Sequence, residues 1–269
     1  MTEQPRVALV GTGVMGEAVL GSLVAAVGAA RVTVTDGRPE HGRAVAERHG
    51  VAWADDNASA AGGADVVVLA VKPKDVAAVC ADLAEALGEG RLVVSVAAGM
   101  TTAYLAERLP AGTRVVRVMP NTPATIGRGI AALSGGGASV PADLDLVGGL
   151  LAGTGETVQV PESQQDVVTA VSGSGPAYVF YLIEAMRDAG VAGGLDAELA
   201  LQLARHTVAG AAELALASDD DPTVLRERVT SPGGTTLAAI TELDRLEVRD
   251  AVGSAVRKAW ERAAELGAS

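Results

Sequence analysis

The sequence of 269 residues predicts an α/β fold, with a doubly wound parallel sheet in its first half and an all-helical second half. Three observations predict it: short apolar runs alternate with helical patterns as far as residue 160, a glycine-rich turn directly follows the first run, and strand patterns stop after residue 161. Strand, crossover helix and strand at this spacing are typical of a parallel sheet with helices on both faces.

The first half contains five clear strand patterns. Near-continuous apolar runs such as residues 66–71 indicate strands that are buried on both faces of the sheet. The predicted strands are residues 6–10, 32–35, 66–71, 92–96 and 115–118. Apolar residues at helical spacing predict helices at residues 15–27, 74–87 and 101–108. Residues 131–134 and 157–160 are predicted to extend the sheet, and between them we expect a glycine-rich turn at residues 135–137 and a helix near residues 142–151.

The second half is predicted to be all-α. Its predicted helices are residues 176–189, 196–217, 222–229, 235–243 and 246–266. We therefore place a domain boundary at about residue 161, with one domain in residues 1–160 and a helical domain in residues 161–269. The second of these helices has a broad apolar face, formed by Leu199, Leu203, Val208, Ala212 and Leu216. This face is either covered within the chain or buried against a partner subunit, in which case the helical half is a dimerisation domain.

Composition and charge exclude several classes of protein. With 33 acidic and 21 basic residues the net charge is −12, which argues against nucleic acid or an anionic membrane as the main partner. A single cysteine cannot form an internal disulfide, and three histidines predict no metal site. No apolar run approaches the roughly 20 residues of a membrane span, and the N-terminus does not resemble a signal peptide. We therefore expect a cytoplasmic protein.

The first motif of chemical interest reads Gly11-Thr12-Gly13-Val14-Met15-Gly16 and lies between the first predicted strand and the first predicted helix. Gly11 allows a tight turn, Gly13 lets the backbone approach a pyrophosphate, and Gly16 allows the helix to pack closely on the strand. The helix N-terminus presents unpaired N–H groups and the positive end of its dipole to the phosphates. The motif in this context predicts a Rossmann-type dinucleotide-binding domain, the alternative being a glycine-rich turn without a ligand.

The end of the second predicted strand is expected to discriminate between the two nicotinamide dinucleotides. Asp36 can accept hydrogen bonds from ribose hydroxyls, which favours NADH and repels a 2′-phosphate. Arg38 can pair with that phosphate, which favours NADPH. The two residues therefore predict opposite preferences, and each has the alternative of being an ordinary solvated turn residue.

Loops after other predicted strands complete the expected cofactor site, because ligands of such sheets lie outside the carboxyl ends of the strands. Two of them should flank the nicotinamide, with small residues that let the flat ring lie against the backbone; they read Ala70-Val71-Lys72-Pro73 and Ala97-Ala98-Gly99. Lys72 is expected to be a positioning or surface residue rather than a catalytic cation. Asn121 lies between Pro120 and Pro123, which indicate a loop of fixed geometry.

Two bends made of small residues open helices in the second half. The first reads Ser172-Gly173-Ser174-Gly175-Pro176-Ala177-Tyr178, and the second reads Ser231-Pro232-Gly233-Gly234-Thr235-Thr236. The second is suited to hold a carboxylate, since it offers consecutive backbone N–H groups, three hydroxyls and no bulky side chain. The alternative is that both bends are ordinary helix N-termini capped by Ser or Thr.

The sequence contains no obvious strong base for catalysis. His206 is predicted to be a structural residue within a helix, and Cys80 a small core residue. His41 and His49 are predicted to be surface residues without a partner at ligand spacing. We therefore expect a reaction whose proton requires no strong enzymic base.

Together these motifs resemble the pyrroline-5-carboxylate reductase family. The resemblance extends over essentially the whole chain and depends on the glycine motif with Met15, on Asn57, on residues 71–73 and 118–124, and on the two bends of the second half. It implies NAD(P)H-dependent reduction of the cyclic imine 1-pyrroline-5-carboxylate to L-proline, the last step of proline biosynthesis. It also implies that the helical domain interleaves with a neighbour to form a homodimer, which in many members assembles further into a decamer.

The resemblance also implies roles for single residues. Thr236 corresponds to the catalytic hydroxyl next to the substrate ring nitrogen, and Asn57 to a cofactor contact. Glu162, four residues before Asp166, corresponds to a carboxylate of the substrate site. The residues that correspond to the substrate carboxylate loop are Ser231, Gly233, Gly234 and Thr235. Residues 35–38 depart from the family, in which many members have Ser or Asn followed closely by Arg; the expected cofactor is NADPH, with NADH as the alternative.

Two other functions share part of this pattern. A 3-hydroxyacid dehydrogenase with the same order of domains would need a catalytic lysine in the first long helix of the second half, and residues 176–189 contain none. A dinucleotide-binding sensor without catalytic activity would need no intact loop at residues 231–236.

Overall fold

The structure is a computed structural model that describes residues 4–267. The chain divides into two compact units: the first contains the residues up to Gly173 together with the C-terminal segment from Ala259, and the second is Ser174–Lys258. The domain boundary near residue 161 stays a prediction from the sequence pattern.

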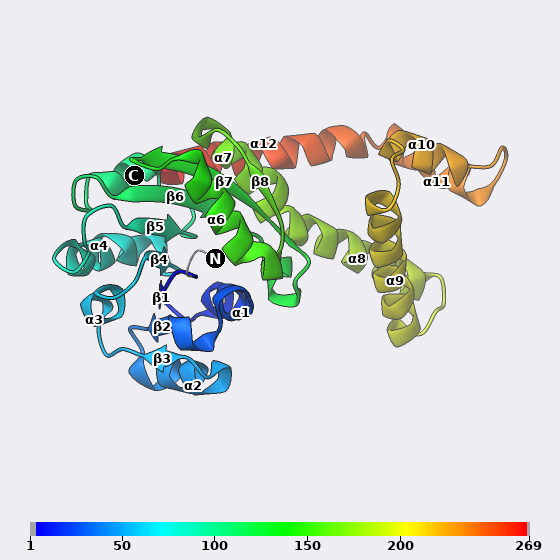
Figure 1. The fold of residues 1–269 in the computed structure, drawn as a ribbon. Coiled ribbons are helices and arrows are strands. Elements are labelled where there is room, and N and C mark those ends of the chain that lie inside the picture. Colours follow the sequence, from blue (N-terminus) through cyan, green and yellow to red (C-terminus); the bar gives the residue numbers. More distant parts are fainter. Residues whose placement is uncertain (1–3, 268–269) are drawn as a thin grey trace. The chain divides into compact units, whose positions relative to one another are not determined.

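One eight-stranded sheet forms the centre of the first unit (Figure 1). Its strands are β1 (Val7–Val10), β2 (Val32–Thr35), β3 (Ala52–Trp53), β4 (Val66–Leu69), β5 (Leu92–Ser95), β6 (Arg114–Met119), β7 (Gly129–Gly137) and β8 (Gly155–Gln159). Their order is β3-β2-β1-β4-β5-β6-β7-β8, and every neighbouring pair is parallel except β6 and β7. The doubly wound sheet is thus confirmed. Its order changes direction at β1 and β4, where such sheets bind their ligands.

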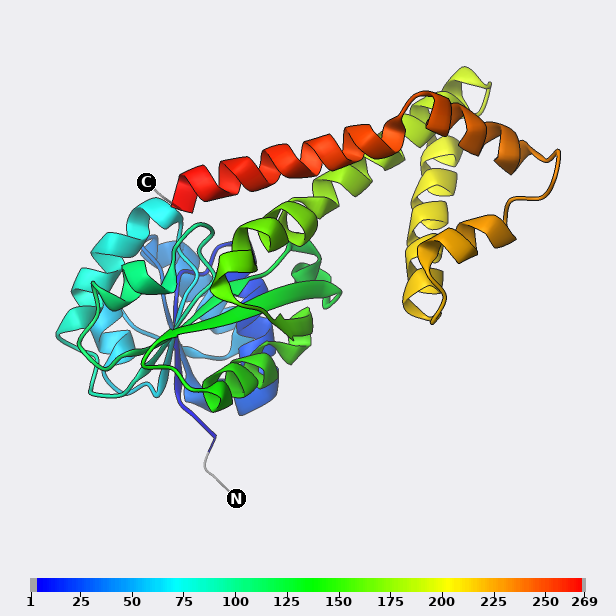
Figure 2. The same cartoon turned by 90° about the horizontal axis from the view of Figure 1, so that it is seen from above.

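Helices cover both faces of this sheet, as Figure 2 shows from above. The helices on one face are α1 (Val14–Val27), α2 (Pro39–His49) and α6 (Pro141–Leu151). Those on the other are α3 (Asn57–Ala61), α4 (Val76–Ala84) and α5 (Thr102–Ala106). Alternate residues of β1 face the two layers: Leu9 packs with α1, and Ala8 with α4. Cys80 of α4 is fully buried, as predicted for a small core residue.

Short helical segments lie between the longer elements of the first unit or follow its last strand. They are η1 (Ala29–Arg31), η2 (Pro73–Asp75), η3 (Thr122–Ile126), η4 (Ala152–Thr154), η5 (Glu162–Gln164), α7 (Gln165–Val168) and the π-helical η6 (Thr169–Gly173). The helix predicted at residues 74–87 is therefore a 3₁₀ turn followed by the shorter α4, and the one predicted at residues 101–108 is α5.

The predicted turn at residues 135–137 is wrong. These glycines continue β7 and pair with the beginning of β6, with Gly137 opposite Arg114. Their lack of side chains serves packing, because a Cβ on Gly136 would lie 2.1 Å from the Oγ1 of Thr102 in α5. Glycine in a strand that another element approaches closely is a known alternative to glycine in a turn.

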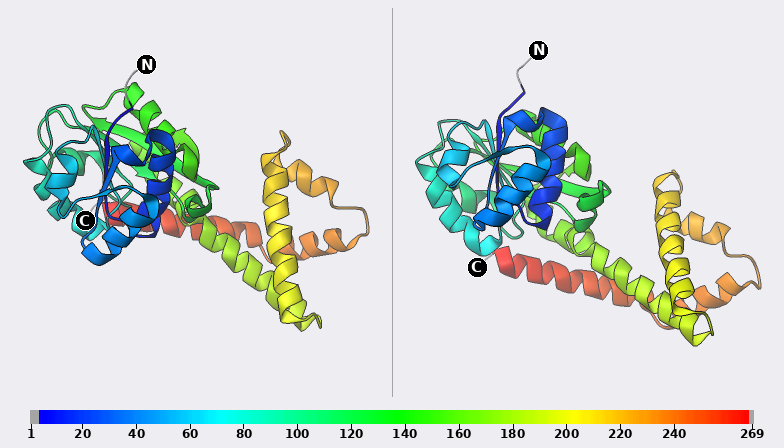
Figure 3. Two further views of the ribbon diagram at one scale, coloured as in Figure 1. Left: turned by 60° about the horizontal axis from the view of Figure 1, so that its bottom comes forward. Right: turned by 90° about the horizontal axis from the view of Figure 1, so that it is seen from below.

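The second unit is helical, as predicted, and Figure 3 shows its helices from two sides. They are α8 (Gly175–Ala192), α9 (Ala197–Leu216), α10 (Pro222–Arg228), α11 (Thr235–Arg245) and the greater part of α12 (Val248–Gly267). Asp196 caps α9 by accepting hydrogen bonds from the backbone of Glu198 and Leu199. Gly190 of α8 allows close packing on α9, since a Cβ there would lie 3.1 Å from the Cβ of Ala200.

The helices of the second unit leave a large apolar area exposed. In α9 only Ala200 and Ala204 are buried, whereas Leu203 is 50% and Leu216 is 85% exposed. Within the second unit this face is thus left largely uncovered. An exposed apolar face of this kind marks a protein–protein interface.

Within residues 4–267 no helix has both the length and the apolar character that a membrane crossing needs.

Candidate active site

The glycine motif forms a tight turn between β1 and α1. Gly11 has a φ of +95° and donates its N–H to the carbonyl of Thr35 at 2.8 Å. A Cβ on Gly11 would lie 2.7 Å from the carbonyl oxygen of Ala70, and one on Gly16 would lie 2.2 Å from that of Gly11. Any side chain at either position would therefore push backbone atoms apart, which explains why glycine occupies both.

Gly13 is different, because its surroundings are open. A Cβ there would meet no heavy atom within 4 Å in the described part of the chain. Gly13 is the N-cap of α1 and makes no side-chain cap, so the first N–H groups of this helix face outward beside the exposed Val14. Met15 packs against the core instead. The arrangement fits a pyrophosphate, which needs close access to backbone N–H groups at a helix N-terminus.

Asp36 lies beneath this turn. Its Oδ2 accepts hydrogen bonds from the N–H and the Oγ1 of Thr12, both at 2.8 Å. Its Oδ1 accepts from the N–H of Arg38 at 2.9 Å and from the Nε at 3.3 Å. The Asp36 side chain is only 8% exposed, whereas that of Arg38 is 65% exposed. Burial alone would raise the pKa of Asp36, but these hydrogen bonds outweigh it and lower the pKa to about 2.

The two histidines of α2, His41 and His49, are half-buried rather than fully exposed, and both have hydrogen-bond partners. His41 is half-buried, and its Nε2–H donates to the carbonyl of Thr12 at 2.9 Å. His49 is also half-buried and contacts the carboxylate of Glu17 at 3.1 Å. Neither contact could be predicted, because the partners are distant in the sequence and α2, which carries both histidines, has a mostly polar pattern.

The loops expected beside the nicotinamide do lie at the same edge of the sheet as this turn. Ala70 follows β4 and donates its N–H to the carbonyl of Val10, and Val96 follows β5 and donates to Leu69. Ala97 is buried, whereas Ala98 is exposed. Lys72 is exposed too. Asn57 begins α3, where its amide donates to the carboxylate of Asp82 at 2.8 Å.

Glu162 belongs to a polar network of the first unit. Its carboxylate accepts hydrogen bonds from the N–H of Thr102 at 2.7 Å and from the Oγ1 at 2.5 Å. The Arg117 guanidinium, 5% exposed, lies 3.4 Å from Glu162 and 3.5 Å from Asp166. Sequence reasoning missed Arg117, although a cation in the apolar run of β6 should have indicated a buried partner. Both oxygens of Glu162 are therefore engaged at the N-terminus of α5.

Asn121 follows β6 and connects three segments. Its amide donates to the carbonyl of Ser172 at 3.2 Å and its oxygen accepts from the N–H of Ile130 at 3.0 Å. These contacts fix the loop at η3 against β7 and η6. The fixed geometry predicted from the two prolines thus has a direct structural basis, while contact with a cofactor stays a prediction.

The bend at residues 231–236 opens α11 in the second unit. Its N-cap is Gly234, and the described structure contains no side-chain cap at this helix. The bend closes through a hydrogen bond from the N–H of Gly234 to the carbonyl of Ser231, and Gly233 has a φ of +70°. Capping by Ser or Thr, the alternative explanation, is therefore not what the structure contains here. The N–H groups of the first turn stay available for an anionic group.

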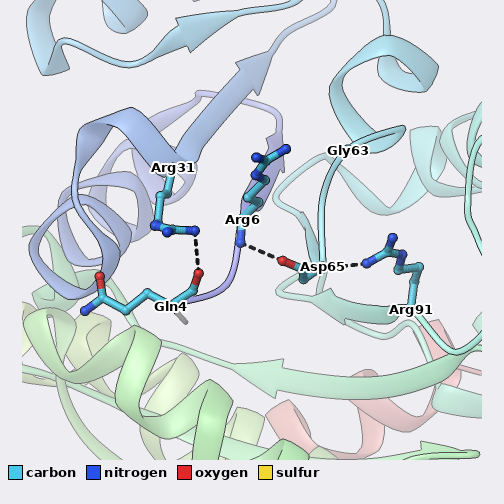
Figure 4. Close-up of a pocket in the computed structure, with 6 residues that line it drawn as sticks. All are labelled: Gln4, Arg6, Arg31, Gly63, Asp65 and Arg91. Carbon is cyan, nitrogen blue, oxygen red and sulfur yellow. Dashed lines mark hydrogen bonds and ion pairs between the residues drawn. The ribbon is translucent and has the colours of Figure 1, made fainter. Parts of the chain in front are cut away.

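A hollow at the opposite edge of the sheet is lined by residues that precede β1, β2, β4 and β5 (Figure 4). Asp65 accepts hydrogen bonds from the N–H of Arg6 at 2.9 Å and from the Nη1 of Arg91 at 2.6 Å. Arg31 donates to the carbonyl of Gln4 at 2.7 Å. These contacts hold the amino ends of the strands together, at the edge of the sheet opposite the turn at residues 11–16, called the phosphate turn below.

Among residues 4–267, no group of His, Cys, Asp and Glu is arranged to hold a metal ion.

Two family models match different parts of the chain. A family model described as pyrroline-5-carboxylate reductase dimerisation matches residues 162–266, which indicates that the chain forms oligomers. A second model, described as NADP oxidoreductase coenzyme F420-dependent, matches residues 6–99.

Similarity to individual proteins extends over the full length. A pyrroline-5-carboxylate reductase of Mycobacterium tuberculosis is 42% identical, with 97% of this chain and 96% of the relative covered. The solved pyrroline-5-carboxylate reductase of Coxiella burnetii superposes with a TM-score of 0.93 at 36% identity, covering 98% of each chain. The pyrroline carboxylate reductase of Plasmodium falciparum, solved with NADP bound, gives a TM-score of 0.87 at 28% identity over 99% and 100% of the two chains. Identity of this level over nearly the whole sequence shows the family, and the chain belongs to the pyrroline-5-carboxylate reductases.

Proposed function

We propose that this oxidoreductase reduces the C=N bond of 1-pyrroline-5-carboxylate with NADPH, yielding L-proline, and that its two units carry different parts of the chemistry. The first unit binds the cofactor and the second holds the substrate carboxylate. The observation that supports the substrate assignment most directly is the N-terminus of α11, where Gly234 leaves the first-turn N–H groups without a side-chain acceptor beside the hydroxyl of Thr236. Backbone N–H groups of this kind bind carboxylates without a cationic side chain.

The cofactor assignment follows from the carboxyl edge of the sheet. The turn from Gly11 to Gly16 fits a pyrophosphate, because the open surroundings of Gly13 leave room where a Cβ would stand. We assign Ala70, Ala97 and Gly99, with their neighbours in both loops, to the nicotinamide. Asn57 and Asn121 are assigned as further cofactor contacts. When bound, NADPH supplies a hydride from C4 of its nicotinamide ring.

The chain's own residues mainly position and polarise the substrate. The N–H groups at Gly233, Thr235 and Thr236, with the hydroxyl of Ser231, hold the substrate carboxylate, while Gly234 shapes the bend by donating its N–H to the carbonyl of Ser231. The hydroxyl of Thr236 hydrogen-bonds the ring nitrogen and relays the single proton that the nitrogen requires. An imine nitrogen is itself basic, so no histidine or lysine is needed as a strong acid or base.

Glu162 is assigned as the carboxylate that favours the protonated imine through its negative charge. Its hydrogen bonds to Thr102 and its proximity to Arg117 partly neutralise that charge, so we expect a modest effect on the rate. Glu162→Gln should lower kcat less than a change at Thr236 does.

We further infer that the oligomer is a homodimer formed by the helical unit, with the decamer as its higher assembly. The exposed apolar residues of α9 support burial against a second copy of the chain. A cytoplasmic location stays a prediction.

The decisive experiment follows NADPH absorbance with 1-pyrroline-5-carboxylate for the wild type, Thr236→Ala and Thr236→Ser. We expect Thr236→Ala to lower kcat by about a hundredfold, the range of acid–base contributions, with an unchanged Kd for NADPH. Thr236→Ser retains the hydroxyl and should retain most of the activity. An unchanged kcat in Thr236→Ala would remove this residue from the mechanism. Oxidation of 3-hydroxy acids instead would support a dehydrogenase, and binding without turnover would support a sensor.

A further inference from the structure

The carboxylate at the end of β2 is already fully used within the chain. Three hydrogen bonds of 2.8–2.9 Å and one of 3.3 Å reach the two oxygens of Asp36 from Thr12 and Arg38. A carboxylate that selects NADH must offer its oxygens outward to the ribose hydroxyls. Asp36 does the opposite, because its side chain is 8% exposed and directed beneath the phosphate turn.

Arg38 is oriented by the same carboxylate. Its N–H donates to the Oδ1 of Asp36 at 2.9 Å and its Nε donates to the same oxygen at 3.3 Å, which restrains the guanidinium beside the carboxylate. Its two Nη groups have no acceptor among the residues that the structure describes, and the side chain is 65% exposed. A guanidinium held through Nε presents its Nη groups as a preorganised pair of donors, the geometry that suits a phosphate.

Two features of α2 keep this arrangement rigid. Gly42 permits a close approach, since a Cβ there would lie 2.9 Å from the Cβ of Asp36 and 2.2 Å from the Trp53 ring. His41 donates from Nε2 to the carbonyl of Thr12, which ties the first turn of α2 to the phosphate turn. The phosphate turn, which would bind the pyrophosphate, and Arg38, which would bind a 2′-phosphate, are therefore connected by hydrogen bonds through Asp36. His41 connects α2 to the same turn.

We propose that Asp36 is a positioning residue for NADPH: it holds Arg38 ready for the 2′-phosphate and does not read the ribose hydroxyls. The inference rests on the proposed use of NADPH and deepens it, because it assigns an acidic residue at the usual NADH-selecting position to the opposite preference.

The two interpretations of Asp36 predict opposite changes in the ratio of NADPH to NADH affinity when Asp36 is replaced by asparagine. If the carboxylate repelled a 2′-phosphate, Asp36→Asn would strengthen NADPH binding and weaken NADH binding. If it positions Arg38, Asp36→Asn removes the charge-assisted contact to the guanidinium, so NADPH binding weakens more than NADH binding does. A side chain that only supported the turn would change both affinities by the same factor.

The test is a titration of the full-length protein with NADPH and with NADH, in the absence of substrate, for wild type, Asp36→Asn, Arg38→Ala and the double variant. We expect the ratio of NADPH to NADH affinity to fall by about fivefold in Asp36→Asn, as for loss of one modest charge-assisted hydrogen bond. In the Arg38→Ala background, Asp36→Asn should leave that ratio unchanged, because the residue being positioned is absent. An unchanged or higher ratio in the single variant, or an equal further fall in the double variant, overturns the proposal.

Wild-type crystals with bound NADP⁺ supply a second test if Asp36→Asn does not fold. Asp36 should still accept from Thr12 while Arg38 contacts the 2′-phosphate, and an Asp36 turned toward the ribose would overturn the proposal. These binding and structural measurements are independent of turnover. Failure to reduce 1-pyrroline-5-carboxylate would therefore count against the proposed function alone.

Discussion

Replacing Gly13 by valine tests the phosphate turn most directly, because the structure separates its effect on folding from its effect on binding. The new side chain would enter a space with no heavy atom of the described chain within 4 Å of the Cβ. The backbone of Gly13, with φ −66° and ψ −174°, is an extended conformation that valine adopts readily. The free energy of unfolding should therefore fall by no more than about 1 kcal/mol, the cost of a poor N-cap residue.

The effect on binding should be much larger. Valine would occupy the space through which a pyrophosphate reaches the N–H groups at the start of α1. Loss of two charge-assisted hydrogen bonds, each worth about 1.5–3 kcal/mol, corresponds to an increase in the Kd for NADPH of at least about a hundredfold. The cofactor effect should thus exceed the folding effect severalfold.

Urea unfolding without ligand and a fluorescence titration with NADPH measure the two effects separately. Gly16→Ala is the contrasting variant, since its Cβ would lie 2.2 Å from a backbone oxygen and should destabilise the fold by about 3 kcal/mol. Gly21→Ala is the matched control within α1: it meets nothing within 4 Å and should stabilise the protein by up to about 1 kcal/mol. Normal NADPH affinity in folded Gly13→Val would refute the assignment of this turn to a pyrophosphate.

Three further predictions concern stability and reactivity. The pKa of Asp36 is lowered from 3.8 to about 2, so its stabilising effect is complete above pH 3.8 and is lost as the pH falls toward 2. Between pH 4 and pH 2, wild type should lose about 2 kcal/mol more unfolding free energy than Asp36→Asn in urea titrations, and parallel losses would contradict this. Burial raises the pKa of Cys80 to about 11, so a thiol reagent at pH 8 should modify native protein about a hundredfold more slowly than urea-unfolded protein; equal rates would show an accessible thiol. Gly136→Ala should lower the unfolding free energy by about 2 kcal/mol because its Cβ would overlap Thr102, whereas Gly149→Ala, with open surroundings in α6, should not; similar values for both would reject the packing of α5 on β7.

Sequence patterns predict the buried elements of this fold well, because the same side chains determine both the pattern and the packing. The apolar runs of β1, β2, β4, β5 and β6 are visible as strands since both faces of each are covered. Elements whose formation depends on neighbours are harder to predict. The two residues of β3 and the polar helix α2 have little apolar periodicity of their own, and the glycines at the end of β7 have the composition of a turn.

Some features of the candidate site could likewise be predicted from the sequence, and others could not. Some backbone features could be predicted from residue type, since a glycine at position 11 allows the positive φ that it has. The absence of a side-chain cap at Gly234 could not, because the bend contains Ser and Thr, which often cap helices. The partners of polar side chains could not, because they come from distant parts of the chain. Glu162 and Thr102 are 60 residues apart, and so a carboxylate expected to face a substrate has its oxygens engaged by a helix N-terminus.

Asp36 shows why residue type at a known position is insufficient to assign cofactor preference. An acidic residue after the second strand favours NADH only if its oxygens are free to face the ribose, and that condition depends on what else the turn contains. Here Thr12 provides two donors from within the glycine motif, and Arg38 provides two more from the following loop. A carboxylate with four donors around it gains nothing by turning outward, since it would exchange these hydrogen bonds for those of a ribose and leave Arg38 without a fixed orientation. If Asp36 positions Arg38 as proposed, the hydroxyl of Thr12 takes part in determining the cofactor, although it lies 24 residues before the carboxylate that it contacts.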